Sequence, residues 1–135
     1  MKMSRAQVPG LKRTDRPLTI QVERHEEAAV IRLGGSCTME VSSQVRHAIV
    51  GLANEEIRLI VLDLSDLDFI DSNGLGGVIA GHLKLRHQRG SIRVVNPSPA
   101  ITELLGVTKL TQIFPIFPDL ASALAAPVEP KPPAR

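Results

Sequence analysis

Asp71 and Ser72 are the residues whose types and spacing best support chemistry, because they stand between the most apolar segment of the chain and a run of glycines. The stretch DFIDSNGLGG spans residues 68–77. If a helix begins here, Ser72 lies near backbone N–H groups that have no partner inside the helix, at the positive end of the helix dipole. Its hydroxyl can then serve as a structural N-cap or accept a phosphoryl group.

The two uses of Ser72 differ in what they change. We predict that Ser72 is the N-cap of a helix that begins near Asn73, a role worth about 1 kcal/mol. A phosphate there would gain about 0.3–1 kcal/mol from the dipole, offset by the neighbouring Asp71, so the fold would hardly change. Two more negative charges near Asp66 and Asp68 could weaken an interface strongly. A phosphorylated Ser72 would therefore act on a partner and not on the fold.

Four glycines follow Ser72 in the same predicted helix. Each costs about 1 kcal/mol relative to alanine in a helix interior. A helix that lies very close to other backbone, in the sheet beneath it or in a partner above it, would need them. We expect Gly74 and Gly76 to permit such an approach. The four are Gly74, Gly76, Gly77 and Gly81.

Hydrophobic periodicity predicts an α/β fold with the order ββαβαβαβα, in which a mixed sheet packs with about four helices. One segment, 58–64, is apolar almost throughout, which is typical of a central strand covered on both faces, and an acidic turn should follow it. Pro115 has no N–H to donate and places the last strand at an edge. The expected strands are residues 18–23, 29–33, 58–64, 91–96 and 112–117, with Gly34 and Gly35 ending the second.

The expected helices differ in how clearly the sequence marks their ends. Ser98 and Pro99 provide an N-cap and a first-turn proline for a short helix. Thr38 is the expected N-cap of the first helix, which should begin near Val41. The last helix should cover residues 119–126. The second helix should stop at Gly90 and bury one apolar face, made of Leu75, Val78, Ile79 and Leu83.

The net charge of +2 is distributed unevenly over the 135 residues. Residues 1–16 carry a net +4 and residues 127–135 a net +1, which leaves −3 for residues 17–126. A mildly acidic body is a poor surface for duplex nucleic acid, and three Phe with no Tyr or Trp offer little for a single strand to stack on. We therefore expect one domain over 17–126, without direct nucleic-acid contact, between a disordered basic tail, 1–16, and a disordered proline-rich tail, 127–135.

The cysteine count and the absence of long apolar segments indicate the compartment and the redox chemistry of the protein. Cys37 is the only cysteine, so no intramolecular disulfide can form. The N-terminal stretch lacks the apolar core of a signal peptide, and no segment approaches the roughly 20 apolar residues of a membrane span. We expect a cytoplasmic protein without membrane contact. Cys37 is expected to be a buried or bystander thiol, since no His or Asp at fixed spacing supports a nucleophile.

Other kinds of site fit the sequence less well. Four aspartates at short spacing could bind Mg²⁺, but the chain lacks a phosphate-cradling glycine-rich loop with its lysine. A phosphoaspartate at Asp63 would need an acidic pair after the first strand and a lysine after the last, and neither is evident. His82 and His87 fall on different sides of a helix and are expected to face solvent. We expect no catalytic residue, metal or cofactor. The four aspartates are Asp63, Asp66, Asp68 and Asp71.

The segment VLDLSDLDFIDSNGLGGVIAG, residues 61–81, resembles the signature of STAS domains, specifically of the bacterial anti-sigma-factor antagonists. The shared pattern is an apolar strand ending in an aspartate, an aromatic residue, and then Asp-Ser-x-Gly-Leu-Gly opening a helix. The downstream stretch NPSPAITELLGVTKLTQIFPIF is also similar to the family, so the resemblance covers about residues 17–126. The matching residues are Asp63, Phe69, Asp71, Ser72, Gly74, Leu75 and Gly76.

The resemblance implies that Ser72 is the phosphoacceptor for a partner anti-sigma factor that is itself an ATP-dependent serine kinase. In such proteins the unphosphorylated antagonist captures the kinase and frees the sigma factor. Phosphorylation ends the capture, and a metal-dependent serine phosphatase restores it. The kinase would hold the ATP, and this chain, a monomer or weak dimer, would have no catalytic activity. The expected partner-binding residues are Thr38, Asp71, Ser72, Asn73, Gly74 and Gly76.

Two positions depart from the family pattern. Thr38 stands where the family often has an acidic residue, and a missing carboxylate there could slow, alter or abolish phosphorylation. Asn73 replaces a frequent serine and removes a second possible acceptor. Thr38 therefore keeps open another class of function, in which the domain is a structural subunit of a signalling scaffold or a lipid-transport complex and Ser72 is an unmodified helix cap.

Overall fold

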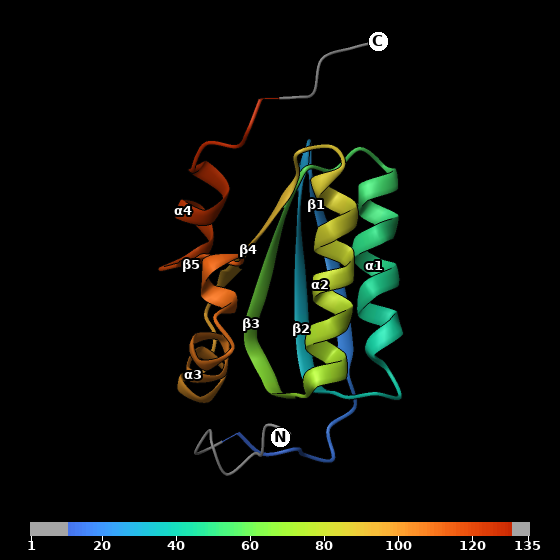
Figure 1. Cartoon of the computed structure of the whole chain (residues 1–135), viewed down its shortest axis with the longest axis vertical. Coiled ribbons are helices and arrows are strands. Elements are labelled where there is room, and N and C mark those ends of the chain that lie inside the picture. Colours follow the sequence, from blue (N-terminus) through green and yellow to red (C-terminus); the bar gives the residue numbers. More distant parts are fainter. Residues whose placement is uncertain (1–10, 131–135) are drawn as a thin grey trace.

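A five-stranded sheet forms the centre of the protein (Figure 1). The computed structural model describes residues 11–130. Strands follow the order β1-β2-β3-β4-β5 across the sheet; β1 is antiparallel to β2, and the other neighbours are parallel. The predicted mixed sheet is confirmed. The strands are β1 (Thr19–His25), β2 (Ala28–Cys37), β3 (Leu59–Ile70), β4 (Ser91–Val95) and β5 (Ile116–Phe117).

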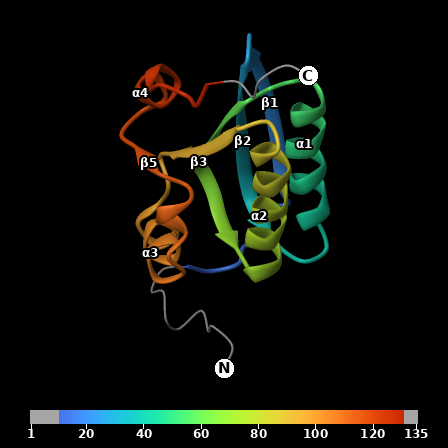
Figure 2. The same cartoon turned by 45° about the horizontal axis from the view of Figure 1, so that its top comes forward.

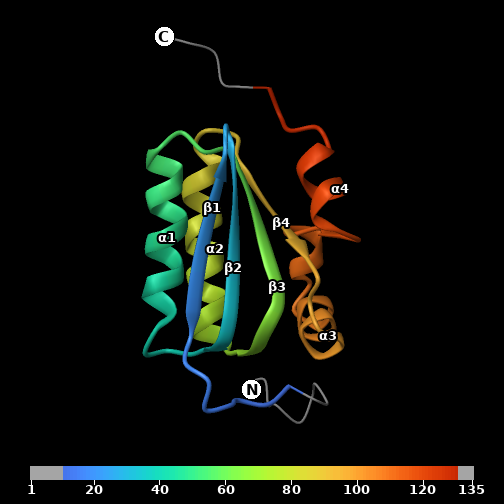
Figure 3. The same cartoon turned by 180° about the vertical axis from the view of Figure 1, so that it is seen from behind.

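Helices cover the two faces of the sheet unequally. α1 and α2 lie side by side on one face (Figures 1 and 2), where the larger cluster of buried apolar residues lies. α4 packs against β3 and β4 over a smaller apolar cluster, and in Figure 3 none of the described helices covers the exposed side of β1 and β2. Within residues 11–130, no helix has the length and apolar composition needed to cross a bilayer. The helices are α1 (Ser42–Asn54), α2 (Ser72–Arg86), α3 (Pro99–Val107) and α4 (Leu120–Ala125).

β2 and β3 run further than the sequence indicated. β2 continues through Gly34 and Gly35 to Cys37, and the acidic stretch 65–68 is part of β3 rather than a turn. Two register shifts interrupt the ladder between them. Gly35 has a φ of +76°, and a Cβ there would lie 2.0 Å from the carbonyl oxygen of Pro17. The glycines therefore admit an irregular strand and the close approach of another segment, and they do not end the strand.

That other segment is residues 11–17, here called the strap, which passes the end of the sheet where β2 and β3 finish (Figures 1 and 3). Leu11 is only 5% exposed, and the N–H of Ser36 donates to the carbonyl oxygen of Arg16 at 3.1 Å. The sequence placed 1–16 in a disordered tail, whereas 11–16 pack against the domain through these long-range contacts. Residues 1–10 lie outside the described part of the chain.

The beginning of the expected C-terminal tail is also held by the domain. Arg93 is 6% exposed and donates to the carbonyl oxygen of Pro127 at 2.6 Å. Arg58 is 7% exposed and donates to the carbonyl oxygen of Glu129, also at 2.6 Å. Buried guanidinium groups thus attach the segment after α4 to the sheet. Residues 131–135 are beyond the described part.

α2 buries Val78 as predicted, and Leu75 and Ile79 are partly buried against the core, while Gly74, Gly81 and Leu85 complete its buried side. Leu83, expected in the core, is 59% exposed. A Cβ on Gly81 would lie 2.6 Å from the side chain of Ile49 on α1, so this glycine lets the two helices approach. The prediction for Leu83 was wrong because the position of α1 decides which face of α2 is covered. The buried residues of α2 are Gly74, Val78, Gly81 and Leu85.

The C-terminal helix and strand agree only in part with those predicted from the sequence. Ser98 caps α3 as predicted, and its Oγ accepts from the N–H of Ile101 at 3.2 Å. The expected strand over 112–117 is reduced to the two residues of β5, because a 3₁₀ turn, η2 (Leu110–Gln112), precedes it. Pro115 lies just before this short edge strand and accepts from the N–H of Val94 at 2.9 Å.

His82 is not the solvent-facing histidine that the sequence indicated. Its ring packs edge-on against Phe114 with centroids 5.2 Å apart, and within residues 11–130 its Nδ1 is buried without a hydrogen-bond partner. Burial, and to a lesser degree the positive charge of Arg86, lowers the pKa of His82. Protonation of this ring therefore opposes folding.

We expect the stability of the fold to decrease as the pH falls below about 6.5, the pKa of an unfolded histidine. The unfolded state binds the proton more readily than the folded state does, so lowering the pH favours unfolding. Urea unfolding midpoints at neutral and mildly acidic pH would measure the effect. His82→Leu should reduce the decrease, whereas the same change at the exposed His47 should leave it in place. An unchanged decrease in His82→Leu would contradict the assignment.

Candidate functional site

The turn between β3 and α2 places Asp71 and Ser72 differently from the sequence prediction. Asp71 is the N-cap: its backbone is extended, with φ −99° and ψ −176°, and its Oδ1 accepts from the N–H of Gly74 at 2.9 Å. Ser72 is the first residue of the helix, and its side chain is exposed. The prediction that Ser72 is the cap was wrong, because the carboxylate one residue earlier already reaches the free N–H. The Ser72 hydroxyl is therefore not engaged in capping.

The β2–α1 loop, residues 38–41, lies next to this turn. The N–H of Asp71 donates to the carbonyl oxygen of Cys37 at 3.1 Å, which joins the end of β2 to the start of α2. Figure 1 shows the loop and the first turn of α2 at the same end of the sheet. Asn73 is exposed beside Ser72. The structure thus brings the two parts of the expected partner surface together.

Gly74 and Gly76 have different surroundings, although the sequence assigned them the same role. A Cβ on Gly74 would lie 2.6 Å from Cγ1 of Ile70 and 2.9 Å from the carbonyl oxygen of Cys37, so the fold itself requires this glycine. A Cβ on Gly76 would meet nothing within 4 Å, and Gly76 is exposed. Only Gly76 therefore leaves open backbone for an approaching molecule.

Cys37 lies beneath the site and is buried, as the sequence indicated. Burial, with a smaller contribution from the negative charge of Asp71, raises the pKa of its thiol to about 11. The thiol is therefore neutral at physiological pH and a poor nucleophile.

Thr38 does not cap α1. The N-cap is Val41, without a side-chain hydrogen bond, and Thr38 is 5% exposed. Its Oγ1 instead donates to Oε1 of Glu40 at 3.3 Å, and Arg13 of the strap donates to the same oxygen at 3.2 Å. The sequence reasoning missed Glu40. The signal available was an acidic residue just before a predicted helix, where the dipole favours negative charge.

A groove of about 270 Å³ runs between the first turns of α1 and α2. The helices come close here because Gly77 has no side chain: a Cβ would lie 2.8 Å from the carbonyl oxygen of Ser42. Asn73 and Gly76 line the groove from α2. Ser72 does not itself line the groove, but it adjoins Asn73 and lies one helical turn before Gly76, so the groove begins beside it.

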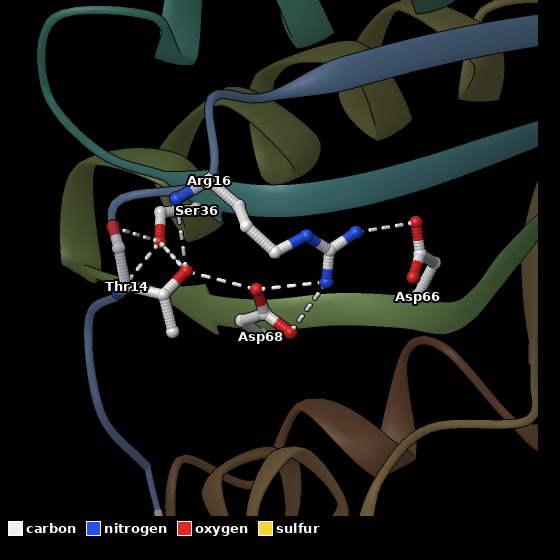
Figure 4. Close-up of polar contacts among 5 residues, drawn as sticks. All are labelled: Thr14, Arg16, Ser36, Asp66 and Asp68. Atoms are coloured by element: carbon white, nitrogen blue, oxygen red, sulfur yellow. Dashed lines mark hydrogen bonds and ion pairs between the residues drawn. The ribbon is translucent and has the colours of Figure 1, made fainter.

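The carboxylates of Asp63, Asp66 and Asp68 bind arginines or backbone N–H groups, and they do not converge on a common centre. Arg16 donates to Asp66 at 2.7 Å and to both oxygens of Asp68 at 2.9 Å (Figure 4). Arg32 lies 3.3 Å from Asp63. Among the residues that the structure describes, no three His, Cys, Asp or Glu side chains are placed to hold a metal ion.

We expect Asp71→Ala to destabilise the fold by about 1 kcal/mol, because the N–H of Gly74 loses its acceptor and the helix loses a negative charge at its positive end. Asp71→Asn keeps an acceptor and should cost less. Urea unfolding of the three proteins measures the difference. An Asp71→Ala variant as stable as the original would show that the cap contributes nothing.

Comparison with known proteins agrees with this fold. The model of the STAS domain matches residues 19–123, and the chain belongs to the STAS domain family. A relative from Paenibacillus polymyxa, named anti-sigma F factor antagonist, is 35% identical over 109 residues, which are 79% of this chain and 92% of that protein. The resemblance to anti-sigma-factor antagonists that the sequence indicated is confirmed.

Solved structures show the same likeness. An anti-sigma factor antagonist from Mycobacterium paratuberculosis is 29% identical, with a TM-score of 0.72 over 84% of this chain and 96% of that one. The phosphorylated form of SpoIIAA, a Bacillus cell fate determinant, is 25% identical, with a TM-score of 0.63 over 78% of this chain and 96% of that one. The fold is therefore that of the antagonists over nearly their whole length.

Proposed function

We propose that this protein is an anti-sigma factor antagonist, and that Ser72 is phosphorylated by an anti-sigma factor with serine kinase activity. The observation that carries the proposal is the exposed Ser72 side chain at the start of α2, left out of capping because Asp71 is the N-cap. The names of the relatives support the role of antagonist. The phosphorylated form of SpoIIAA supports a phosphoryl switch in this fold.

Phosphoryl transfer would need little from this chain besides presentation of the hydroxyl. The Ser72 oxygen would form a bond to the γ-phosphorus of ATP held by the kinase, the bond from that phosphorus to the bridging oxygen of ADP would break, and the proton would pass to a base on the kinase. Asp71 would hold the first turn of α2 in place through Gly74. The exposed Asn73 and Gly76 would leave room for the kinase active site.

The regulatory cycle follows from this chemistry. The unphosphorylated protein would bind the anti-sigma factor in the cytoplasm and release the sigma factor. A phosphate on Ser72 would oppose the phosphates of the nucleotide in the partner and end the complex. A serine phosphatase would restore the binding form. The protein itself would act by binding and not as an enzyme.

The test is phosphorylation by a defined kinase. The anti-sigma F factor of Paenibacillus polymyxa, for which the 35% identical relative is named, would be incubated with Mg-ATP and this protein, followed by intact-mass analysis and peptide mapping. One phosphoryl group on Ser72 is expected, and none in Ser72→Ala. Ser43→Ala is the matched control, because Ser43 is an exposed serine in the first turn of α1. An unmodified Ser72 would contradict the proposal.

The alternative is a structural subunit in which Ser72 is never modified. The observation that favours it is that Thr38, which stands where the family often has an acidic residue, is buried. Peptide mapping of the protein from growing and stressed cells separates the two functions. Phosphate on Ser72 that varies with growth supports the antagonist, whereas an unmodified Ser72 in a fixed complex supports the structural subunit.

A further inference from the structure

The strap supplies arginines to an acidic end of the domain. Arg16 binds Asp66 and Asp68 (Figure 4), and Arg13 binds Glu40 through its Nη2 at 3.2 Å. Both arginines precede the segment that the STAS model matches. The three carboxylates thus receive these positive charges from outside the family domain.

One part of the strap is anchored firmly. The N–H of Thr14 donates to Oγ of Ser36 at 3.0 Å, and Oγ1 of Thr14 donates to Asp68 at 2.8 Å. Ser36 is 7% exposed, so the Thr14–Ser36 hydrogen bond is partly shielded from water, whereas the Thr14–Asp68 bond is exposed. Because Arg13 is the neighbour of Thr14, the anchor holds Arg13 close to the β2–α1 loop.

The ion pair between Arg13 and Glu40 is different, because it lies in water. The two side chains are 54% and 58% exposed, and exposed pairs of this kind contribute little and open readily. Thr38, which is 5% exposed, donates to the same Glu40 oxygen. If Arg13 leaves, Thr38 still orients the carboxylate. Glu40 is therefore a preorganised anion whose counter-ion is easily exchanged.

We propose that Glu40 contacts a basic side chain of the anti-sigma factor and that Arg13 occupies this place in the free protein. The inference rests on the proposed function. The loop that carries Glu40 is joined to Asp71 through the carbonyl oxygen of Cys37, so a partner that reaches Ser72 also passes over the loop. The exposed carboxylate of Glu40, once Arg13 is displaced, favours a partner that is basic at this point.

The test is a titration of the anti-sigma F factor of Paenibacillus polymyxa, loaded with ADP, with single variants of this protein. Glu40→Gln removes the contact and should raise Kd about three- to tenfold. Arg13→Gln removes the competitor and should lower Kd about two- to fivefold. The double variant should resemble Glu40→Gln. Glu55→Gln is the matched control, because Glu55 forms an exposed ion pair with Arg24 at the other end of α1 and should bind unchanged.

The expected changes in Kd have opposite signs: Glu40→Gln raises Kd and Arg13→Gln lowers it. If the ion pair were merely structural, both single variants would bind more weakly. That result, or an unchanged Kd for Glu40→Gln, would overturn the inference while leaving the proposed function intact. Weaker binding by Arg13→Gln alone would also overturn it, since Arg13 itself would then contact the partner. Absence of binding by the original protein would instead contradict the proposed function.

Discussion

Ser72→Asp is expected to weaken binding to the ADP-loaded anti-sigma factor by at least about tenfold, and phosphorylated Ser72 by about a hundredfold. The side chain is exposed at the start of α2, where the proposed kinase would place nucleotide phosphates against it. A negative charge at this position therefore meets like charge in the complex. Isothermal titration with the original protein and the variant measures the loss.

A matched variant separates the effect of the charge at position 72 on binding from the effect of side-chain size. Ser72→Asn has nearly the shape of Ser72→Asp but no charge, and it should keep most of the affinity. Ser72→Ala should bind fully and accept no phosphate. Equal affinities for Asp and Asn at this position would show that charge is not the signal. All of these side chains are exposed, so unfolding midpoints should change little and confirm that the fold is intact.

Gly74→Ala and Gly76→Ala are expected to change stability in opposite directions. A Cβ at Gly74 would lie 2.6 Å from Ile70 and 2.9 Å from the carbonyl oxygen of Cys37, and such overpacking costs about 1–3 kcal/mol. A Cβ at Gly76 meets nothing within 4 Å, so alanine there should stabilise the helix by about 0.5–1 kcal/mol. Urea unfolding of both variants measures this. Equal destabilisation would show that the surroundings of the two glycines are not as described.

Partner binding separates the role of Gly76 from its effect on the fold. Gly76→Ala should be more stable and yet bind the anti-sigma factor more weakly, because the added methyl group narrows the groove between α1 and α2. Gly51→Ala is the control: Gly51 on α1 also has nothing within 4 Å of a Cβ, so it should gain stability and bind normally. Undiminished binding by Gly76→Ala would show that the partner does not use the groove.

The position of the site could be predicted from the sequence, but its capping could not. The apolar run of β3 and the glycines after Ser72 located the start of α2 to within one residue. Asp71 and Ser72 are both favourable N-cap residues, so composition does not decide between them. The extended backbone of Asp71 decides between them, and the hydrogen bond from its N–H to the end of β2 is a contact that composition does not reveal.

The strap could not be predicted because its contacts are long-range. Arg16 and its partner Asp66 are separated by 50 residues, and a basic segment with few apolar residues has the composition of a disordered tail. Gly35 is the residue in the domain whose role depends on the strap. Its left-handed backbone and its closeness to Pro17 make it a glycine that lets the strap approach, whereas the sequence alone makes it a glycine that ends a strand.

The buried arginines that hold the segment after α4 also decide how the protein can be handled in these experiments. Arg93 and Arg58 hold that segment at the end of the sheet opposite the first turn of α2 (Figure 1). A surface or affinity tag attached beyond residue 130 would leave Ser72 facing the solution. Attachment ahead of the strap would place the support beside the surface to be measured, so binding assays should use the C-terminal side for immobilisation.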